Sequence, residues 1–201
     1  ALAHDIGNPP FGHGGEKAIG LYFSHGAGKR FKDRLSPAEY QDLIDFEGNA
    51  QGFKMLNETR DGIVGGLRLS YATLGAFIKY PKESLPKKPS AQVSDKKFNV
   101  FQSDKEFFHD LAQSLELSPK TQEGESKRYH RHPLAFLVEA ADDICYTIID
   151  FEDGINLGWI SEEFAMEYLM NFVSDMIITE IYNQLEQTAD RFSYLRTLAI
   201  N

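Results

Sequence analysis

The sequence contains a single cysteine and a single tryptophan, and it has no long apolar run. One cysteine, Cys145, excludes a disulfide within the chain, which fits a reducing compartment, and we expect this thiol to be buried and inert. No apolar run approaches the roughly 20 residues that a membrane helix needs, and no segment has the pattern of a signal peptide. We therefore expect a cytoplasmic protein without a membrane anchor.

Positive charge is also scarce, because 21 Lys and Arg residues face 30 Asp and Glu residues, for a formal net charge of −9. Proteins that bind nucleic acid generally do so through Lys and Arg, so this balance gives no support to a nucleic-acid partner. It remains compatible with a local basic pocket for one small anion. The length of 201 residues suits one domain, or one large piece of a bigger one.

Helical patterns dominate the chain. Proline and glycine positions and 3–4 apolar spacing predict helices at residues 1–6, about 14–23, 37–46 running on into 47–56, 67–81, 104–117, 133–154 and 161 to about 189. Ser36 with Glu39, and Ser103 with Glu106, have the spacing of capping boxes. The Pro/Lys/Ser-rich stretch 81–97 predicts an exposed loop, and only 97–101 could form a short strand. The predicted class is all-α.

A His-Asp pair, His4 and Asp5, precedes a Gly-Asn-Pro-Pro turn. Imidazole and carboxylate groups that converge on one cation are what metal-assisted phosphate chemistry needs. The best further candidate is Asp142, which shares one face of the 133–154 helix with Tyr146 and Asp150 at spacings of four. Carboxylates beside an apolar stripe are costly unless they are paired, so this face predicts a cation or a donor-rich ligand. Local caps and salt bridges are the alternative reading.

His13 and Glu16 follow the turn and fall on one helix face at a spacing of three, where the carboxylate can orient the imidazole. Imidazole exchanges protons readily near neutral pH, which suits acid–base catalysis. A phosphorylated substrate would also need cations. The basic candidates, each of which can equally be a solvated surface charge, are Lys17, Arg60, Arg68, Lys79, Lys127, Arg128 and Arg131.

The stretch "AHDIGNPPFGHGGE" (3–16) resembles the signature of the HD-domain phosphohydrolases, and within them the deoxyguanosine triphosphate triphosphohydrolase family. Residues 47–56, 66–81 and 132–154 resemble the same family, in the same order. The resemblance implies an all-helical HD-domain bundle with a divalent metal: Mg, Mn or another transition metal. Four side chains would hold that metal. His4, Asp5 and Asp142 match three of them, and the first histidine has no match in this sequence.

By the same resemblance, His13 and Glu16 form a catalytic pair beside the α-phosphate. Tyr146 and Asp150 match positions that line the nucleotide, and Glu47, Asn49 and Gln51 match a segment near the pocket. We expect residues 1–201 to be a single HD-domain region that lacks the upstream helix with the first metal histidine and a C-terminal part.

The implied activity is metal-dependent hydrolysis of deoxynucleoside triphosphates, dGTP above others, to deoxynucleoside and triphosphate. Two alternatives stay open. The chain could act on another phosphoester, as a phosphodiesterase or nucleotidase, or it could be a non-catalytic nucleotide-binding module. The resemblance also implies a homo-oligomer. Nucleic-acid effectors are known among relatives, although the charge of this chain gives them no support.

Overall fold

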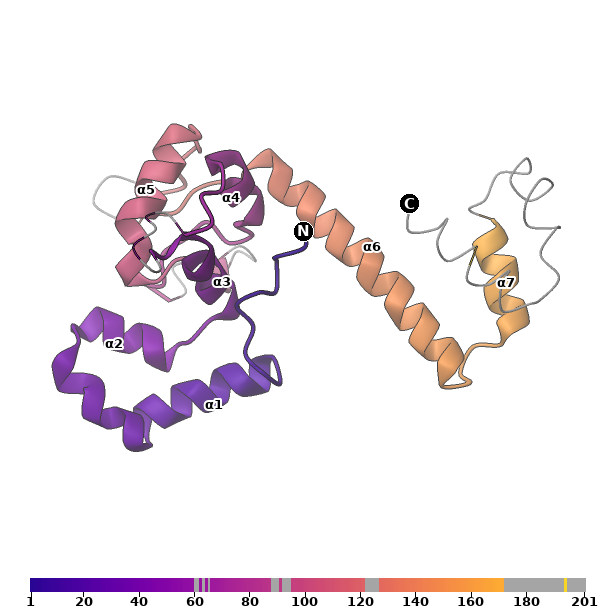
Figure 1. The fold of residues 1–201 in the computed structure, drawn as a ribbon, viewed down its shortest axis with the longest axis horizontal. Coiled ribbons are helices and arrows are strands. Elements are labelled where there is room, and N and C mark those ends of the chain that lie inside the picture. The colour runs from indigo at the N-terminus through magenta and orange to yellow at the C-terminus, as the bar shows by residue number, and fades with distance from the viewer. Residues whose placement is uncertain are drawn as a thin grey trace. The chain divides into compact units, whose positions relative to one another are not determined.

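The computed structural model describes residues 1–59, 62, 64, 66–87, 91, 95–121, 127–171 and 194. Its helices are α1 (His13–Ser24), η1 (Ala27–Arg34), α2 (Pro37–Ile44), α3 (Gly48–Asn57), α4 (Tyr71–Phe77), η3 (Gln102–Asp104), α5 (Lys105–Ser114), α6 (Pro133–Asn156) and α7 (Glu162–Met170) (Figure 1). The all-α class is confirmed. The described residues form no strand, and the predicted strand at 97–101 is wrong, since Val100 makes only an isolated bridge to Glu83.

The chain forms two compact units, residues 1–139 and 140–201. In the first unit, α3 lies between the α4–α5 pair and the α1–α2 pair (Figure 1). Its core is apolar, with side chains at most 3% exposed: Phe53, Leu56, Leu74, Ile78, Val100, Phe108 and Leu111. Burying each of these large side chains contributes about 1.5–3 kcal/mol. The core therefore fixes α3, whose N-terminus faces the motif-bearing segment 1–16.

Helix α2 begins as predicted. The Ser36 hydroxyl accepts a hydrogen bond from the Glu39 backbone N–H, and the Glu39 carboxylate accepts one from the Ser36 N–H, 3.0 Å away. These two bonds satisfy N–H groups that a helix start leaves without partners, and Pro37 fits the first turn because it has no N–H to satisfy. The chain then breaks at Asp45 before α3 starts, so 37–56 is two helices.

Three other predicted elements need correction. Residues 1–7 form successive turns with hydrogen bonds between residues three apart, such as His4 N–H to the Ala1 carbonyl, and do not form an α-helix. Helix α4 begins only at Tyr71, because Arg68 has a left-handed φ of 53° and the Ser70 side chain caps the start. The Ser103 capping box is absent, since the side chain of Asp104, the N-cap of α5, makes no capping bond.

The segment 81–97 is not simply an exposed loop. Pro81, Lys82, Glu83 and Ser84 are buried, and Lys82 is only 1% exposed. The Lys82 ammonium donates to the carbonyls of Glu83, Pro86 and Lys87 at 3.1–3.3 Å. Burial lowers the pKa of Lys82 to about 8. The composition of the segment predicted that its lysines lie in solvent. Three carbonyl acceptors instead stabilise the buried ammonium group of Lys82.

The described part of the second unit contains the C-terminal part of α6, together with α7. Helix α6 matches the predicted 133–154 element, and Ser161 caps α7 as predicted, with its hydroxyl accepting from the Phe164 N–H. The predicted continuation of α7 to residue 189 lies outside the described residues. Cys145 is exposed on α6, contrary to the expectation of a buried thiol. None of the described helices combines the length and apolar character that crossing a bilayer requires.

Candidate functional site

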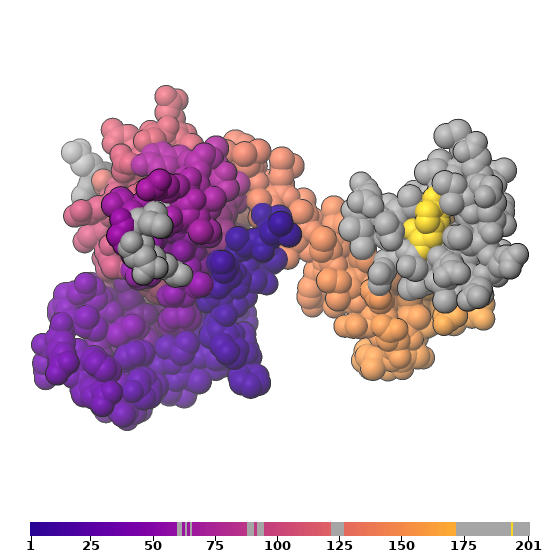
Figure 2. All heavy atoms as spheres, in the orientation of Figure 1, coloured from indigo at the N-terminus to yellow at the C-terminus, as the bar shows by residue number. Residues whose placement is uncertain are grey.

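The N-terminal segment is indigo in Figure 2. Its turns carry His4 and Asp5, whose side chains are 37% and 66% exposed. The Nδ1 atom of His4 is 2.8 Å from the Ala1 carbonyl oxygen, so Nδ1 carries the proton and donates it. Nε2 of His4 lies 3.2 Å from Oδ2 of Asp5, and the other Asp5 oxygen accepts from the Asn8 amide at 2.7 Å. The Nε2 atom of the imidazole and a carboxylate oxygen therefore face one another.

This pair fits a shared cation. Two ligands that are each about 2.0–2.2 Å from a metal are separated by about 3.0–3.5 Å at tetrahedral or octahedral angles. The 3.2 Å between His4 Nε2 and Asp5 Oδ2 falls in that range. Nδ1 and Oδ1 are held by the Ala1 carbonyl and the Asn8 amide, which is how outer-shell partners orient metal ligands. Within the described residues, no group of three or more potential ligands converges.

Close backbone contact holds these turns against α3. A Cβ atom added to Gly7 would lie 2.1 Å from the backbone nitrogen of Gly52, and one added to Gly48 would lie 2.3 Å from Oδ1 of Asn8. Contacts this short leave no room for a methyl group, so Gly7 and Gly48 allow the approach. The same Asn8 that orients Asp5 therefore packs directly on the start of α3.

His13 and Glu16 meet as their spacing predicts. Nδ1 of His13 is 2.8 Å from Oε2 of Glu16, and Oε1 of Glu16 accepts from the Gly48 backbone N–H at 2.9 Å. A carboxylate only accepts, so Nδ1 of His13 carries a proton and Nε2 is left for a ligand. The His13 side chain is 73% exposed and that of Glu16 is 15% exposed. The geometry is that of an oriented, accessible imidazole.

Glu47 and Asn49 are also together, at the start of α3. The Glu47 carboxylate accepts from the Asn49 side-chain amide at 2.7 Å and lies 3.4 Å from the Lys97 ammonium. Glu47 is buried and acts as the N-cap of α3, which places negative charge where the helix dipole favours it. Gln51 faces a different cavity, described below.

A cavity of about 650 Å³ connects these groups. His13, Glu16 and Glu47 line it, and so do four lysines: Lys17, Lys87, Lys96 and Lys97. Lys87 pairs with Asp45 in the cavity wall. The lysine ammonium groups would attract a polyanion to the space beside the imidazole. Glu16, Asp45 and Glu47 line the same cavity, and Lys87 and Lys97 pair with Asp45 and Glu47, so the excess of positive charge in the cavity is small.

Of the basic residues proposed from sequence, only Lys17 lines this cavity. Lys79 and Arg131 both pair with Glu139, at 3.0 and 2.7 Å, and Arg128 pairs with Asp95 at 2.6 Å. Arg68 and Lys127 are exposed elsewhere, and Arg60 lies outside the described residues. The sequence analysis missed Asn8, Gly48 and the lysines at 87, 96 and 97. Among these residues, only Asn8 had a recognisable sequence signal, because it lies in the Gly-Asn-Pro-Pro turn.

Asp142, Tyr146 and Asp150 lie on α6 within the second unit, four residues apart as predicted. Tyr146 is 65% exposed, so its ring is open to a ligand. The proposed joint role of Asp142 with His4 and Asp5 stays a prediction, as do the nucleotide contacts of Tyr146 and Asp150.

Several curated proteins are similar in sequence to nearly the whole chain. No protein-family model matches it. A deoxyguanosinetriphosphate triphosphohydrolase-like protein of Pseudomonas aeruginosa is 42% identical over 99% of the chain and 43% of its own length. One of the same name from Synechocystis is 41% identical over 100% of the chain and 46% of its own length. The deoxyguanosinetriphosphate triphosphohydrolase of Klebsiella pneumoniae is 30% identical over 98% of the chain and 42% of its own length.

The chain spans less than half the length of these curated relatives. The similarity nevertheless extends over nearly all of its own residues, including the His-Asp turn, α1, α3 and α6. The chain belongs to the family of deoxyguanosinetriphosphate triphosphohydrolase-like proteins.

Proposed function

We propose that the chain carries the catalytic pair of a metal-dependent deoxynucleoside triphosphate triphosphohydrolase, with dGTP as the preferred substrate. The reaction is water plus dNTP giving deoxynucleoside and triphosphate. The single observation that carries the proposal is the His13–Glu16 contact at 2.8 Å, at the edge of a cavity lined by four lysines. The names of the relatives support a nucleotide triphosphate as substrate, and dGTP among them.

His13 would transfer a proton at the α-phosphate. Water attacks the α-phosphorus, the bond to the 5′-oxygen breaks, and Nε2 of His13 gives its proton to that oxygen. The proton released by the attacking water returns to Nε2 and restores the imidazolium ring. Glu16 accepts from Nδ1 throughout and stabilises the protonated ring, while its bond to the Gly48 N–H holds the carboxylate still.

The triphosphate would lie along the lysines. Lys17 is one turn from His13 on α1, and Lys96 and Lys97 line the same cavity from another segment. Ammonium groups on two sides can contact the β- and γ-phosphates while the α-phosphate stays beside His13. Triphosphate released intact is the product expected from this placement.

His4 and Asp5 would hold the divalent metal, with Asp142 as a further ligand. When bound, such a metal supplies Lewis-acid polarisation of a phosphate oxygen and lowers the pKa of a water molecule. The fit of the pair rests on the 3.2 Å separation and on the outer contacts to Ala1 and Asn8. The donor set, imidazole and carboxylate, accepts Mg, Mn or another transition metal.

The test uses the natural protein after it has been loaded with Mn²⁺ and dialysed. Its bound Mn²⁺ and its rate of dGTP hydrolysis are both measured. His4→Ala and Asp5→Asn should each lose the metal and the activity together. His25→Ala is the matched control, because His25 is exposed and its ring hydrogen-bonds to the neighbouring Ser24 hydroxyl. Stoichiometric Mn²⁺ in both ligand variants would contradict this metal assignment. Release of orthophosphate or pyrophosphate would leave the metal pair in place and contradict the substrate and reaction.

A further inference from the structure

Lys82 is a buried charged residue that no step of the proposed reaction uses. It is 1% exposed, and its ammonium group donates to the carbonyls of Glu83, Pro86 and Lys87 at 3.1, 3.3 and 3.1 Å. These three acceptors match its three N–H donors, so the charged form is fully hydrogen-bonded. A buried cation held in this way fixes the position of its acceptors, because each of them would lose its donor if the ammonium group moved.

Two of these acceptors depend on the ammonium group alone. In the part of the chain that the structure describes, the carbonyls of Pro86 and Lys87 accept hydrogen bonds only from Lys82. Ser84, in the same segment, is held independently, because its hydroxyl accepts from the Gln102 side-chain amide at 3.0 Å. The buried charge therefore determines where residues 86–87 lie, and it matters less for residue 84.

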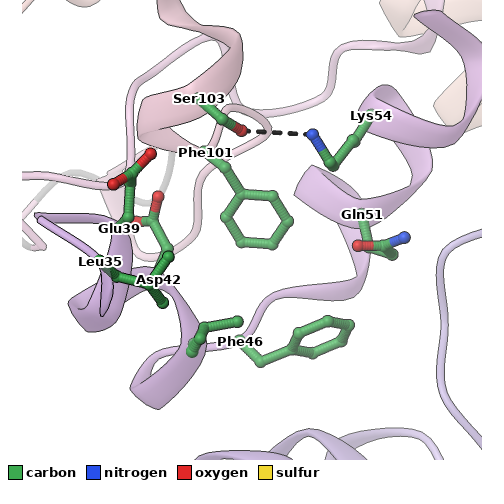
Figure 3. Close-up of a pocket in the computed structure, with 9 residues that line it drawn as sticks. Leu35, Glu39, Asp42, Phe46, Gln51, Lys54, Phe101 and Ser103 are labelled. Carbon is green, nitrogen blue, oxygen red and sulfur yellow. Dashed lines mark hydrogen bonds between the residues drawn. The ribbon is translucent and has the colours of Figure 1, made fainter. Parts of the chain in front are cut away.

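The Gln102 end of this region is anchored at a second cavity. The Gln102 backbone N–H donates to Asp42 on α2 at 2.6 Å. Asp42 and Gln51 line this cavity, which has a volume of about 320 Å³ (Figure 3). It shares Phe46 with the cavity that contains His13, and none of its other lining residues lines that larger cavity. This anchor therefore belongs to the second cavity and does not hold the lysines of the first.

The Lys82 ammonium group contacts two parts of the wall of the cavity beside His13. Lys87 lines that cavity, and its carbonyl is one of the three acceptors. Phe98 lines it as well, and the ammonium group lies over the Phe98 ring, 5.5 Å from its centroid. One buried charge therefore touches both stretches, at 87 and at 96–98, through which this segment contributes lysines to the cavity.

The charge on Lys82 is what maintains these contacts. Burial lowers the pKa of Lys82 to about 8. The charged side chains that act on it are Asp95, Glu83 and Glu47, which favour the charged form, and Arg128, which opposes it. Glu83 is itself paired with His109 at 2.9 Å. A neutral amine has two N–H donors for three carbonyls and loses its electrostatic attraction to the Phe98 ring, so these contacts weaken as the pH rises through 8.

We propose that Lys82 is a positioning residue for the triphosphate, whose buried ammonium group holds the Lys87 backbone and the Phe98 ring so that the cavity lysines face the phosphates. The inference rests on the proposed function, because it concerns the same cavity, and it assigns a role to a residue that touches no substrate atom. Loss of the charge should weaken triphosphate binding and leave the His13–Glu16 contact in place.

The test measures the binding of inorganic triphosphate by calorimetry, without metal, at pH 7 and at pH 9. The unmodified protein should bind about 5- to 20-fold more tightly than Lys82→Met at pH 7, and at most about 2-fold more tightly at pH 9. The ratio at each pH cancels the titration of triphosphate itself. Lys105→Met, on exposed α5, is the matched control, and its ratio should stay the same at both pH values.

A second variant keeps the test valid if Lys82→Met folds poorly. The Lys87 side chain is 56% exposed, so Lys87→Gln should fold normally. The unmodified protein should bind triphosphate about 10-fold more tightly than Lys87→Gln at pH 7 and about 2-fold more tightly at pH 9, because Lys87 loses its position when Lys82 loses its charge. The depressed pKa of Lys82 makes folding more favourable as the pH rises, so this loss of affinity would not arise from partial unfolding.

Affinity ratios that do not change with pH would overturn the proposal. So would a pH-dependent ratio of the same size for Lys105→Met, or the absence of saturable triphosphate binding at millimolar concentration. Hydrolysis of dGTP is measured separately. If the ratios change as expected and no dGTP is hydrolysed, the positioning role stands and the proposed reaction fails. If dGTP is hydrolysed and the ratios stay constant, the reaction stands and the positioning role fails.

Discussion

Oε1 of Glu16 accepts a hydrogen bond from the backbone N–H of Gly48, 2.9 Å away and 32 residues along the chain. The second Glu16 oxygen holds His13 at 2.8 Å. One carboxylate thus satisfies an N–H at the start of α3 and orients the imidazole on α1. The orientation of the candidate catalytic histidine therefore depends on the contact between Glu16 on α1 and the backbone of Gly48 at the start of α3.

Gly48→Ala should destabilise the protein by about 1–3 kcal/mol, the usual cost of overpacking a tight contact. The new Cβ would lie 2.3 Å from Oδ1 of Asn8 and 3.2 Å from Oε1 of Glu16, so the side chains that orient Asp5 and His13 would have to shift. Urea unfolding measures the loss. Gly14→Ala is the matched control, because its Cβ would meet nothing closer than 3.9 Å and should be near neutral. Equal stability of the two variants would show that the contact is not tight.

Glu16→Gln should lower kcat by about 10²- to 10⁴-fold and change KM little. Both Glu16 oxygens accept hydrogen bonds, whereas glutamine has one accepting oxygen, so either His13 or the Gly48 N–H loses its acceptor. Steady-state kinetics with dGTP measures the effect. Glu106→Gln, on the exposed face of α5, is the control and should keep full activity. Full activity of Glu16→Gln would remove this pair from the mechanism.

Lys17→Gln and Lys96→Gln should each lower kcat/KM for dGTP by roughly 5- to 50-fold, the range expected for losing one charge-assisted contact to phosphate. Both lysines line the cavity beside His13. The loss should shrink at high salt, because screening weakens the contact in the unmodified enzyme as well. Lys105→Gln, on exposed α5, provides a lysine outside the cavity. A loss of the same size in that control would indicate only a general effect of charge.

The buried Lys82 should make stability rise with pH. Its folded pKa is about 8, below the value of 10.5 for free lysine, so between these pH values the unfolded chain binds more protons. The cost of burying the charge is present below pH 8 and is relieved as the pH rises through that value. Relative to Lys82→Met, the unmodified protein should gain about 2–3 kcal/mol between pH 7 and pH 10. A difference that stays constant with pH would contradict the assignment.

Short sequence patterns predicted those elements whose hydrogen bonds join residues close together in the sequence. Ser36, Pro37 and Glu39 form their capping box because its donors and acceptors lie within four residues. The periodic run after Pro133 became a helix of 24 residues for the same reason. The His13–Glu16 contact also follows from a spacing of three on one helix.

Contacts between distant segments carried no local signal. The composition of 81–97 suggested solvent exposure, yet Asp95 in that segment is buried and accepts a hydrogen bond from Arg128, 33 residues away. Lys97 reaches Glu47 across 50 residues. Asp42 on α2 accepts a hydrogen bond from the backbone N–H of Gln102, 60 residues away. Pattern reasoning located the contact between His13 and Glu16 and missed most of the cavity beside it.

The most direct measurement is the fate of labelled oxygen when the natural protein, with Mn²⁺, hydrolyses dGTP in water enriched in oxygen-18. Attack at the α-phosphorus puts the label in the triphosphate and leaves the deoxyguanosine 5′-oxygen unlabelled. We predict intact triphosphate carrying one labelled oxygen, lost together with activity in Glu16→Gln. Labelled orthophosphate or pyrophosphate, or label in the nucleoside, would contradict the account.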